Sequence, residues 1–142
     1  MNRTFYINDS ATVKFTYGQL IEHINSSVLE APNNYLSIVS LLKNLVNSEV
    51  DSIEHLLDQV KNSSETIWLN TSGTTGQPKE YGHSASSFVY NVKTAEKLTG
   101  VCWALAYSAK HTAGLQTIFQ ALFTQSSLVD VYQQSASAIY DS

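Results

Sequence analysis

The spacing of hydrophobic and polar residues changes several times along the chain, and each change predicts a new helix or strand. Short apolar runs flank a polar stretch near Asn8, which predicts an extended or hairpin segment over residues 4–16. Thr16 is followed three residues later by Gln19, which is the spacing of a helix capping box. Apolar residues at helical spacing then predict three helices, over residues 17–29, 34–47 and 51–61.

The second half of the chain alternates strand-like and helix-like segments. Residues 66–69 form a short β-rich run, and residues 101–107 form a continuous apolar run that predicts a strand buried on both faces. The pattern also predicts helices over 84–98 and 111–124, a strand over 127–131 and the start of a helix in 133–142.

This order of elements predicts an α/β fold with a mainly parallel sheet and flanking helices, preceded by a helical N-terminal segment. We expect a single incomplete domain over residues 1–142. Residues 1–63 are expected to be mostly helical, and residues 64–142 to form the α/β part.

Composition narrows the classes of function. The chain has 142 residues, a formal net charge of -4 and 43% hydrophobic residues, so it can build a globular core. The acidic balance argues against nucleic acid as a partner, because phosphate binding needs clustered Lys and Arg. No apolar run reaches the roughly 20 residues needed to span a bilayer. The first residues, Met1–Phe5, are not followed by an apolar leader, so we expect a cytoplasmic protein without a membrane partner.

Cysteine and histidine placement predicts no metal site. Cys102 is the one cysteine, and its apolar neighbours Val101 and Trp103 predict a buried structural thiol, with a reactive thiol as the alternative. The four histidines show no metal-ligand spacing. His23 and His55 fall on separate predicted helices and are interpreted as surface or packing residues.

Residues 71–79, with the sequence Thr-Ser-Gly-Thr-Thr-Gly-Gln-Pro-Lys, are the candidate ligand-binding segment. The glycines allow backbone N–H groups to turn inward, and the hydroxyls and the lysine add donors and charge, which together favour a polyanion such as phosphate. The segment is not a Walker A loop, because only two residues separate Gly73 from Gly76. A flexible interdomain linker is the alternative, but a linker has no reason to follow a strand-like run directly.

The same nine residues resemble the signature phosphate loop of the ANL superfamily of adenylate-forming enzymes: acyl-CoA synthetases, adenylation domains of peptide synthetases and luciferases. In that family aliphatic residues precede the loop, as Ile67 and Leu69 do here, whereas Glu80 stands where the family usually has glycine.

A second segment is similar to the family's strand followed by His-x-x-Gly. His111 and Gly114 match this pattern, and Ser108 stands where the family usually has proline. In the family the histidine lies near the acyl pocket, at the start of a helix; the alternative for His111 is an ordinary helix-start histidine. His83 also falls where the family often has a histidine, although packing or capping is its favoured interpretation.

The resemblance covers about residues 64–132 and implies a partial ANL-type N-terminal domain. The implied parent activity is ATP-dependent, AMP-forming activation of a carboxylic acid as acyl-AMP, with Mg²⁺, followed by transfer to coenzyme A or a carrier-protein thiol. The family's ribose-binding, metal-binding and C-terminal catalytic positions have no counterpart here, so we expect the isolated chain to be inactive. Lys79 would offset charge on the leaving pyrophosphate, and His111 would line the acyl side. The implied nucleotide-binding residues are Thr71, Ser72, Gly73, Thr74, Thr75, Gly76 and Lys79.

Three functions stay open. The chain is the N-terminal part of an adenylating ligase, completed by a missing C-terminal portion or a second chain; or a non-catalytic module that binds nucleotide or a partner; or a scaffold segment with a vestigial loop. The low charged fraction, 14%, hints at a covered surface, so a homo-oligomer is also considered.

Overall fold

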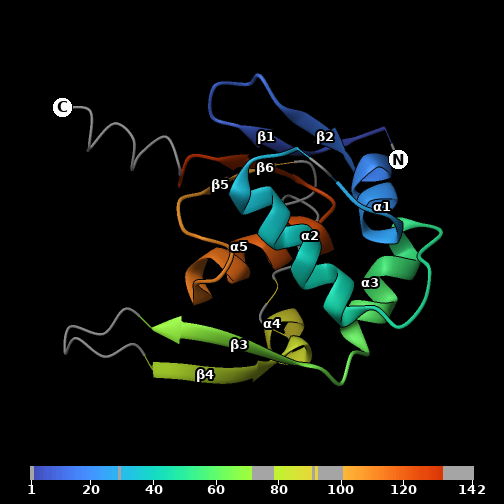
Figure 1. Ribbon diagram of the computed structural model, residues 1–142, viewed down its shortest axis with the longest axis vertical. Helices are drawn as coiled ribbons and strands as arrows, with labels where there is room; N and C mark the ends of the chain where they lie inside the picture. The colour runs from blue at the N-terminus through green and yellow to red at the C-terminus, as the bar shows by residue number, and fades with distance from the viewer. Residues whose placement is uncertain (1, 29, 72–78, 91, 93–100, 133–142) are drawn as a thin grey trace.

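The computed structural model describes residues 2–28, 30–71, 79–90, 92 and 101–132. Its helices lie on one side of a four-stranded sheet, and a separate β-hairpin lies at the far end of the helical layer (Figure 1). The α/β class with a mainly parallel sheet is therefore confirmed. The strands are β1 (Thr4–Asn8), β2 (Lys14–Thr16), β3 (Thr66–Thr71), β4 (Lys79–Ser84), β5 (Cys102–Leu105) and β6 (Ser127–Asp130). The helices are α1 (Tyr17–Asn25), α2 (Asn33–Leu45), α3 (Ile53–Lys61), α4 (Ala85–Tyr90) and α5 (Thr112–Phe123).

The main sheet has the strand order β2-β1-β6-β5. β1 pairs antiparallel with β2, which confirms the predicted hairpin, and β6 pairs in parallel with β1 and β5. The register of β1 on β2 shifts between Thr4 and Tyr6, so the pairing is irregular at Phe5. This irregularity explains why Phe5 and Tyr6 are both buried although they are adjacent. The N-terminal segment thus supplies the strand next to β6.

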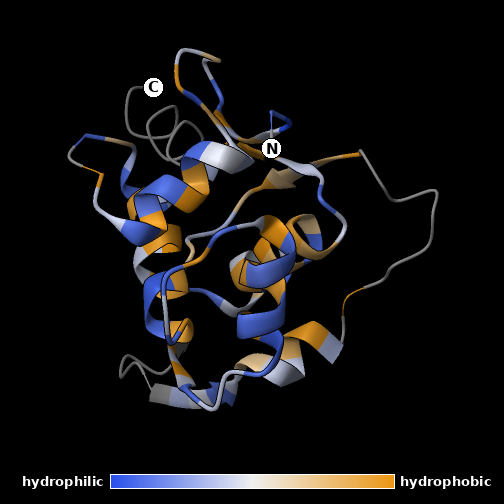
Figure 2. Ribbon diagram, turned by 90° about the vertical axis from the view of Figure 1, so that its right-hand side faces the viewer, coloured by the Kyte–Doolittle hydropathy of each residue, from blue (hydrophilic) through white to orange (hydrophobic). Residues whose placement is uncertain are grey.

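The three N-terminal helices follow the predicted pattern closely. Thr16 and Gln19 form the predicted capping box of α1, and the Ser52 hydroxyl accepts the His55 N–H at the start of α3. α1 ends at Asn25, four residues earlier than predicted, where both the N–H and the hydroxyl of Ser26 donate to the Glu22 carbonyl. Figure 2 shows that the helices carry both hydrophobic and hydrophilic residues, as expected of helices that cover a core.

The prediction for the strand at 66–69 is wrong in one respect. The segment is a strand, but β3 pairs antiparallel with β4 and does not join the parallel sheet. Residues 79–84, Lys-Glu-Tyr-Gly-His-Ser, lack an apolar alternation, so their pattern did not predict β4. Cross-strand pairing with β3 supplies the backbone hydrogen bonds that this polar segment needs.

The predictions for the apolar run at 101–107 also need correction. The strand covers Cys102–Leu105 at the edge of the sheet, and the described helices lie against one of its faces. Leu105 is fully buried on that face, whereas Cys102 and Ala104 are exposed on the other. The Cys102 thiol is therefore exposed and not a buried structural residue as predicted.

The remaining predictions are confirmed in part. α5 and β6 agree with the predicted helix over 111–124 and strand over 127–131 within one or two residues at each end. Of the helix predicted over 84–98, α4 is described, while residues 93–100 and the predicted tail helix at 133–142 lie outside the described residues. Among the helices that the structure describes, none has the length and apolar character to cross a membrane.

Candidate functional site

The β3–β4 hairpin holds both ends of the predicted phosphate loop. Thr71 and Lys79 are paired in the strand register, so the loop leaves and re-enters the same two-stranded ladder. Residues 72–78, including Ser72, Gly73, Thr74, Thr75 and Gly76, lie outside the described residues. Ladder pairing fixes where the loop begins and ends, which a linker between domains would not require.

His111 lies immediately before α5, as the resemblance implied. It is the N-cap residue, and its Nδ1 accepts the Ala113 N–H at 3.1 Å. Its ring stacks on Tyr107, with 4.9 Å between centroids and 16° between planes. Because Nδ1 accepts a hydrogen bond, the proton of the neutral ring belongs on Nε2. His111 therefore presents an N–H donor on the side of the ring away from the helix.

Close packing explains why position 114 is occupied by glycine. A Cβ at this position would overlap the Ser108 carbonyl oxygen and carbon. That same carbonyl accepts the His111 N–H at 3.0 Å and closes the turn before α5. The His-x-x-Gly spacing thus lets the helix lie directly against the turn. Ser108 replaces the family's usual proline without loss of this turn, and its hydroxyl accepts the Lys110 N–H.

A groove of about 590 Å³ brings the two predicted segments together. One wall comes from β3, through Ile67 to Leu69, and another from Ala109 and Lys110 in the turn before α5. α2 completes it on a third side. The strand that leads into the predicted phosphate loop therefore lies beside the turn that carries His111.

A second cavity, of about 470 Å³, is lined by the first residue of this turn together with β5, α4 and α5. Its lining includes Tyr107, which stacks on His111, and Trp103 from β5. Ala113 and Thr117 line it from α5, and Phe88 lines it from α4. The Trp103 Nε1–H is buried and has no hydrogen-bond partner among the described residues. The cavity combines apolar walls with a few polar groups, which is typical of small-molecule pockets.

The other histidines pack or form local contacts. The His83 ring lies 5.7 Å from that of Phe88, as its packing interpretation predicted. His23 shares a hydrogen bond with the Tyr35 hydroxyl at 2.7 Å, and burial lowers the pKa of His23. His55 contacts Asp51 at 3.1 Å. No three His, Cys, Asp or Glu side chains gather as metal ligands within the described part of the chain.

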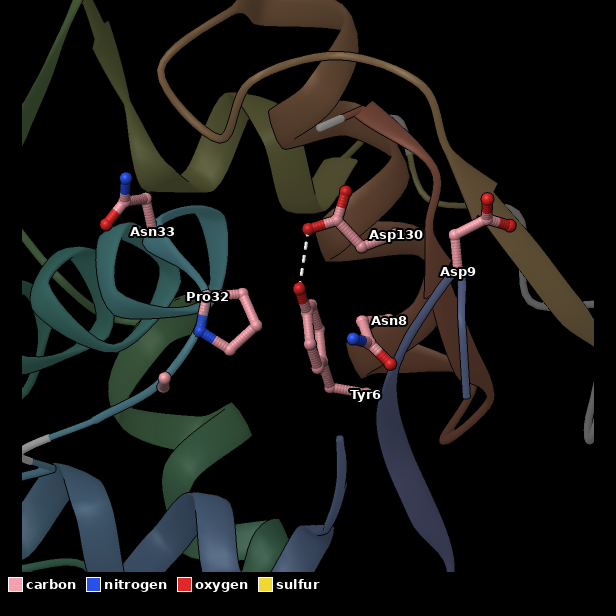
Figure 3. A pocket seen from close by; sticks show the side chains of 7 residues that line it. Tyr6, Asn8, Asp9, Pro32, Asn33 and Asp130 are labelled. Carbon is pink, nitrogen blue, oxygen red and sulfur yellow. Dashed lines mark hydrogen bonds between the residues drawn. The ribbon is translucent and has the colours of Figure 1, made fainter. Parts of the chain in front are cut away.

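Sequence patterns did not predict a buried polar cluster at the carboxyl ends of β1 and β6. The Tyr6 hydroxyl donates to Asp130 Oδ2 at 2.6 Å (Figure 3). Burial, together with the hydrogen bond to Asp130, raises the pKa of Tyr6 well above its usual range. Asn34 Nδ2 approaches the other carboxylate oxygen at 3.4 Å. The one sequence signal for this cluster was Asp130 at the end of a predicted strand. In parallel sheets, ligand-binding groups gather at the carboxyl ends of the strands, so a polar residue there could have been noted.

Comparisons with known proteins support the fold. No model of a protein family matches the sequence, and no curated protein matches it either. Several solved structures do match, and two of them are described here. The luciferase-like enzyme of the mealworm Zophobas morio is 14% identical with a TM-score of 0.56, over 90% of this chain and 50% of that one. The N-terminal domain of FACL13 from Mycobacterium tuberculosis is 13% identical with a TM-score of 0.52, over 91% of this chain and 53% of that one.

The chain thus spans about half the length of these solved structures. At such low identity the likeness concerns the fold alone. It agrees with the resemblance that residues 71–79 and the His-x-x-Gly segment carry. The chain therefore shares its α/β fold with about half of this luciferase-like enzyme and about half of the N-terminal domain of FACL13.

Proposed function

We propose that this chain is the N-terminal part of an ATP-dependent, AMP-forming carboxylate ligase. In this reaction a carboxylate oxygen attacks the α-phosphorus of ATP, an acyl-AMP forms, and pyrophosphate leaves. The acyl group then passes to a thiol of coenzyme A or of a carrier protein. The observation that carries the proposal is the Thr71–Lys79 sequence held between paired strands, beside the turn that presents His111.

The residues of the loop fit a polyphosphate by their chemistry. Hydroxyl and backbone N–H donors would bind the β- and γ-phosphates and orient the α-phosphate for in-line attack. Lys79 would supply a positive charge to the leaving pyrophosphate. The proposed nucleotide-binding set is Thr71, Ser72, Gly73, Thr74, Thr75, Gly76 and Lys79. Mg²⁺ would accompany the ATP phosphates.

His111 would act on the acyl side as a hydrogen-bond donor. Its Nδ1 is engaged by the Ala113 N–H, which leaves the Nε2–H for a carboxylate oxygen. The neighbouring 470 Å³ cavity would receive the rest of the acid, with Tyr107 and Trp103 as walls. We place the acid there because the Tyr107 ring joins the cavity to the histidine.

The alternative is a non-catalytic module that binds nucleotide or a partner chain. The ligase and a nucleotide-binding module both require phosphate binding, whereas a partner-binding module does not. Only the ligase requires a completing portion, from a longer chain, a second chain or an oligomer. We therefore expect the isolated chain to show no carboxylate-dependent ATP–pyrophosphate exchange. If ATP–pyrophosphate exchange appears when a completing chain is added, the result supports the ligase. If the chain binds nucleotide but no completing chain produces exchange, the result supports the non-catalytic module.

The substitution Lys79→Ala tests the proposed role of the loop. We expect it to weaken ATP and pyrophosphate binding ten- to a hundredfold, since a charge-assisted contact contributes about 1.5–3 kcal/mol. Isothermal titration calorimetry measures this directly. Lys14→Ala is the matched control, because Lys14 is an exposed lysine of β2 in the other sheet. Equal affinities for Lys79→Ala and the unchanged chain would refute phosphate binding by this loop.

A further inference from the structure

We infer that Asn34 is a positioning residue for the acyl side of the site: it holds the turn from Tyr107 to His111 and thereby orients the His111 ring. This inference rests on the proposed function for the meaning of that orientation. The structural relation itself can be measured without any substrate.

Asn34 makes three polar contacts from a buried position. It is 4% exposed and lies in the first turn of α2. Its Oδ1 accepts the Ala109 N–H at 2.7 Å, and its Nδ2 donates to the Tyr107 carbonyl at 3.3 Å. The same Nδ2 approaches Asp130 Oδ1 at 3.4 Å. One side chain thus connects α2, the end of β6 and the turn after β5.

The contacts to Tyr107 and Ala109 lie on either side of Ser108. The Ser108 carbonyl accepts the His111 N–H and is the group that Gly114 packs against. Asn34 therefore fixes both flanks of the residue on which the start of α5 depends. Because the Tyr107 ring stacks on His111, a shift of this turn would also move the imidazole.

Asp130 determines which way the Asn34 amide faces. A carboxylate only accepts hydrogen bonds, so the NH₂ group must point toward it and Oδ1 must point toward Ala109. Asp130 is itself fixed by the Tyr6 hydroxyl at 2.6 Å and the Tyr132 N–H at 3.1 Å. The Tyr6–Asp130 pair, drawn in Figure 3, thus holds the Asn34 amide in the one orientation that the turn requires.

The substitution Asn34→Asp separates positioning from simple filling of space. Aspartate has nearly the same shape and keeps an acceptor for Ala109. It loses both donated hydrogen bonds, however, and brings a second carboxylate toward Asp130. Asn33→Ala is the matched control, since Asn33 is the preceding residue of α2 and is exposed.

Proton NMR of the 142-residue chain without ligand reads out the His111 ring. The stack on Tyr107 should give ring-to-ring Overhauser contacts and an upfield ring-current shift of the His111 protons. We expect Asn34→Asp to lose both while the Phe5–Tyr17 ring contacts of the core persist. We expect Asn33→Ala to keep them. A folded Asn34→Asp chain with unchanged Tyr107–His111 contacts would overturn the inference.

Amide hydrogen exchange of the unchanged chain decides the matter if Asn34→Asp does not fold. The Ala109 N–H should be protected as strongly as the Leu115 N–H of α5, because its acceptor is a buried side chain. Exchange of Ala109 at the rate of an exposed amide would overturn the inference. Neither measurement uses nucleotide or acid, so failure here leaves the proposed function standing, and failure to bind ATP leaves this result standing.

Discussion

At the scale of single residues, Gly114 allows close packing because it has no side chain. α5 approaches the Ser108 carbonyl so closely that any Cβ at position 114 would overlap it. The turn before His111 can therefore form against the helix only when position 114 is glycine. A glycine inside a helix costs about 1 kcal/mol relative to alanine, so the close approach must offset that cost.

Gly114→Ala should therefore lower the free energy of unfolding by about 1–3 kcal/mol, although alanine favours helices, because overpacking displaces the turn. Urea denaturation followed by circular dichroism measures this. Gly18→Ala in α1 is the control, and there the better helix former should be neutral or stabilising. A stabilising Gly114→Ala would contradict the packing that the structure shows.

His23 should make stability depend on pH. Burial lowers its pKa; Glu22 acts against this effect and Lys43 adds to it. The unfolded chain, with a histidine pKa near 6.5, thus takes up a proton more readily than the folded chain. The contribution to stability is complete above about pH 6.5 and is lost as pH falls toward the lower folded pKa.

Denaturation at several pH values between about 5 and 8 tests this expectation. Stability should decrease on the acid side of about pH 6.5, and His23→Gln should reduce that slope. Glutamine can still form a hydrogen bond with the Tyr35 hydroxyl, so the packing contact is partly kept. An identical slope in the two proteins would show that His23 does not cause it.

Residue-level prediction from the sequence succeeded where spacing carries the information. The Thr16–Gln19 box and His111 at a helix start follow from short local patterns. Asn34 and Asp130 could not be predicted in this way, because 96 residues separate them and only the fold brings them together. No local pattern specifies a hydrogen bond of that range.

At the scale of elements, the start of α1 is fixed by a reciprocal cap. The Thr16 hydroxyl accepts the Gln19 N–H at 3.1 Å, and Gln19 Oε1 accepts the Thr16 N–H at 2.8 Å. Thr16→Ala should cost about 1 kcal/mol of stability, since it leaves an N–H of the first turn without its acceptor. Thermal unfolding measures the loss.

Thr16→Ser is the matched comparison, because serine keeps the capping oxygen. It should retain most of the stability that Thr16→Ala loses. Equal losses for both substitutions would mean that the methyl group of Thr16, and not its hydroxyl, stabilises the end of α1.

Two strands show what the spacing of apolar residues cannot predict. The run at 101–107 is apolar throughout, and such runs usually belong to strands covered on both faces. Here β5 lies at the edge of the sheet, and the described helices cover one face. β4 is polar and was not predicted, because its stability as a strand comes from its ladder with β3. Both differences are set by the neighbours of the strand, which the local sequence does not specify.

At the scale of the whole molecule, the sheet and the hairpin position different parts of the candidate site. The four-stranded sheet and its helices hold the turn before His111, and the separate β3–β4 hairpin holds the two ends of the proposed phosphate loop. The groove lined by α2, β3 and Lys110 connects them. The predicted division at residue 63 does not coincide with the main sheet, since β1 from the first part pairs with β6 from the second.

Titration of the isotope-labelled chain with Mg·ATP, followed by amide NMR, shows whether residues 71–79 bind the ATP phosphates. We predict saturable shifts of the Thr71 and Lys79 amides, where the hairpin meets the loop, and none at Lys14 in β2. AMP should produce much smaller shifts, because it lacks the β- and γ-phosphates that the loop is proposed to bind. Equal shifts with AMP and ATP would refute binding of the β- and γ-phosphates by this loop. An ATP response that leaves the Thr71 and Lys79 amides unchanged would refute it as well.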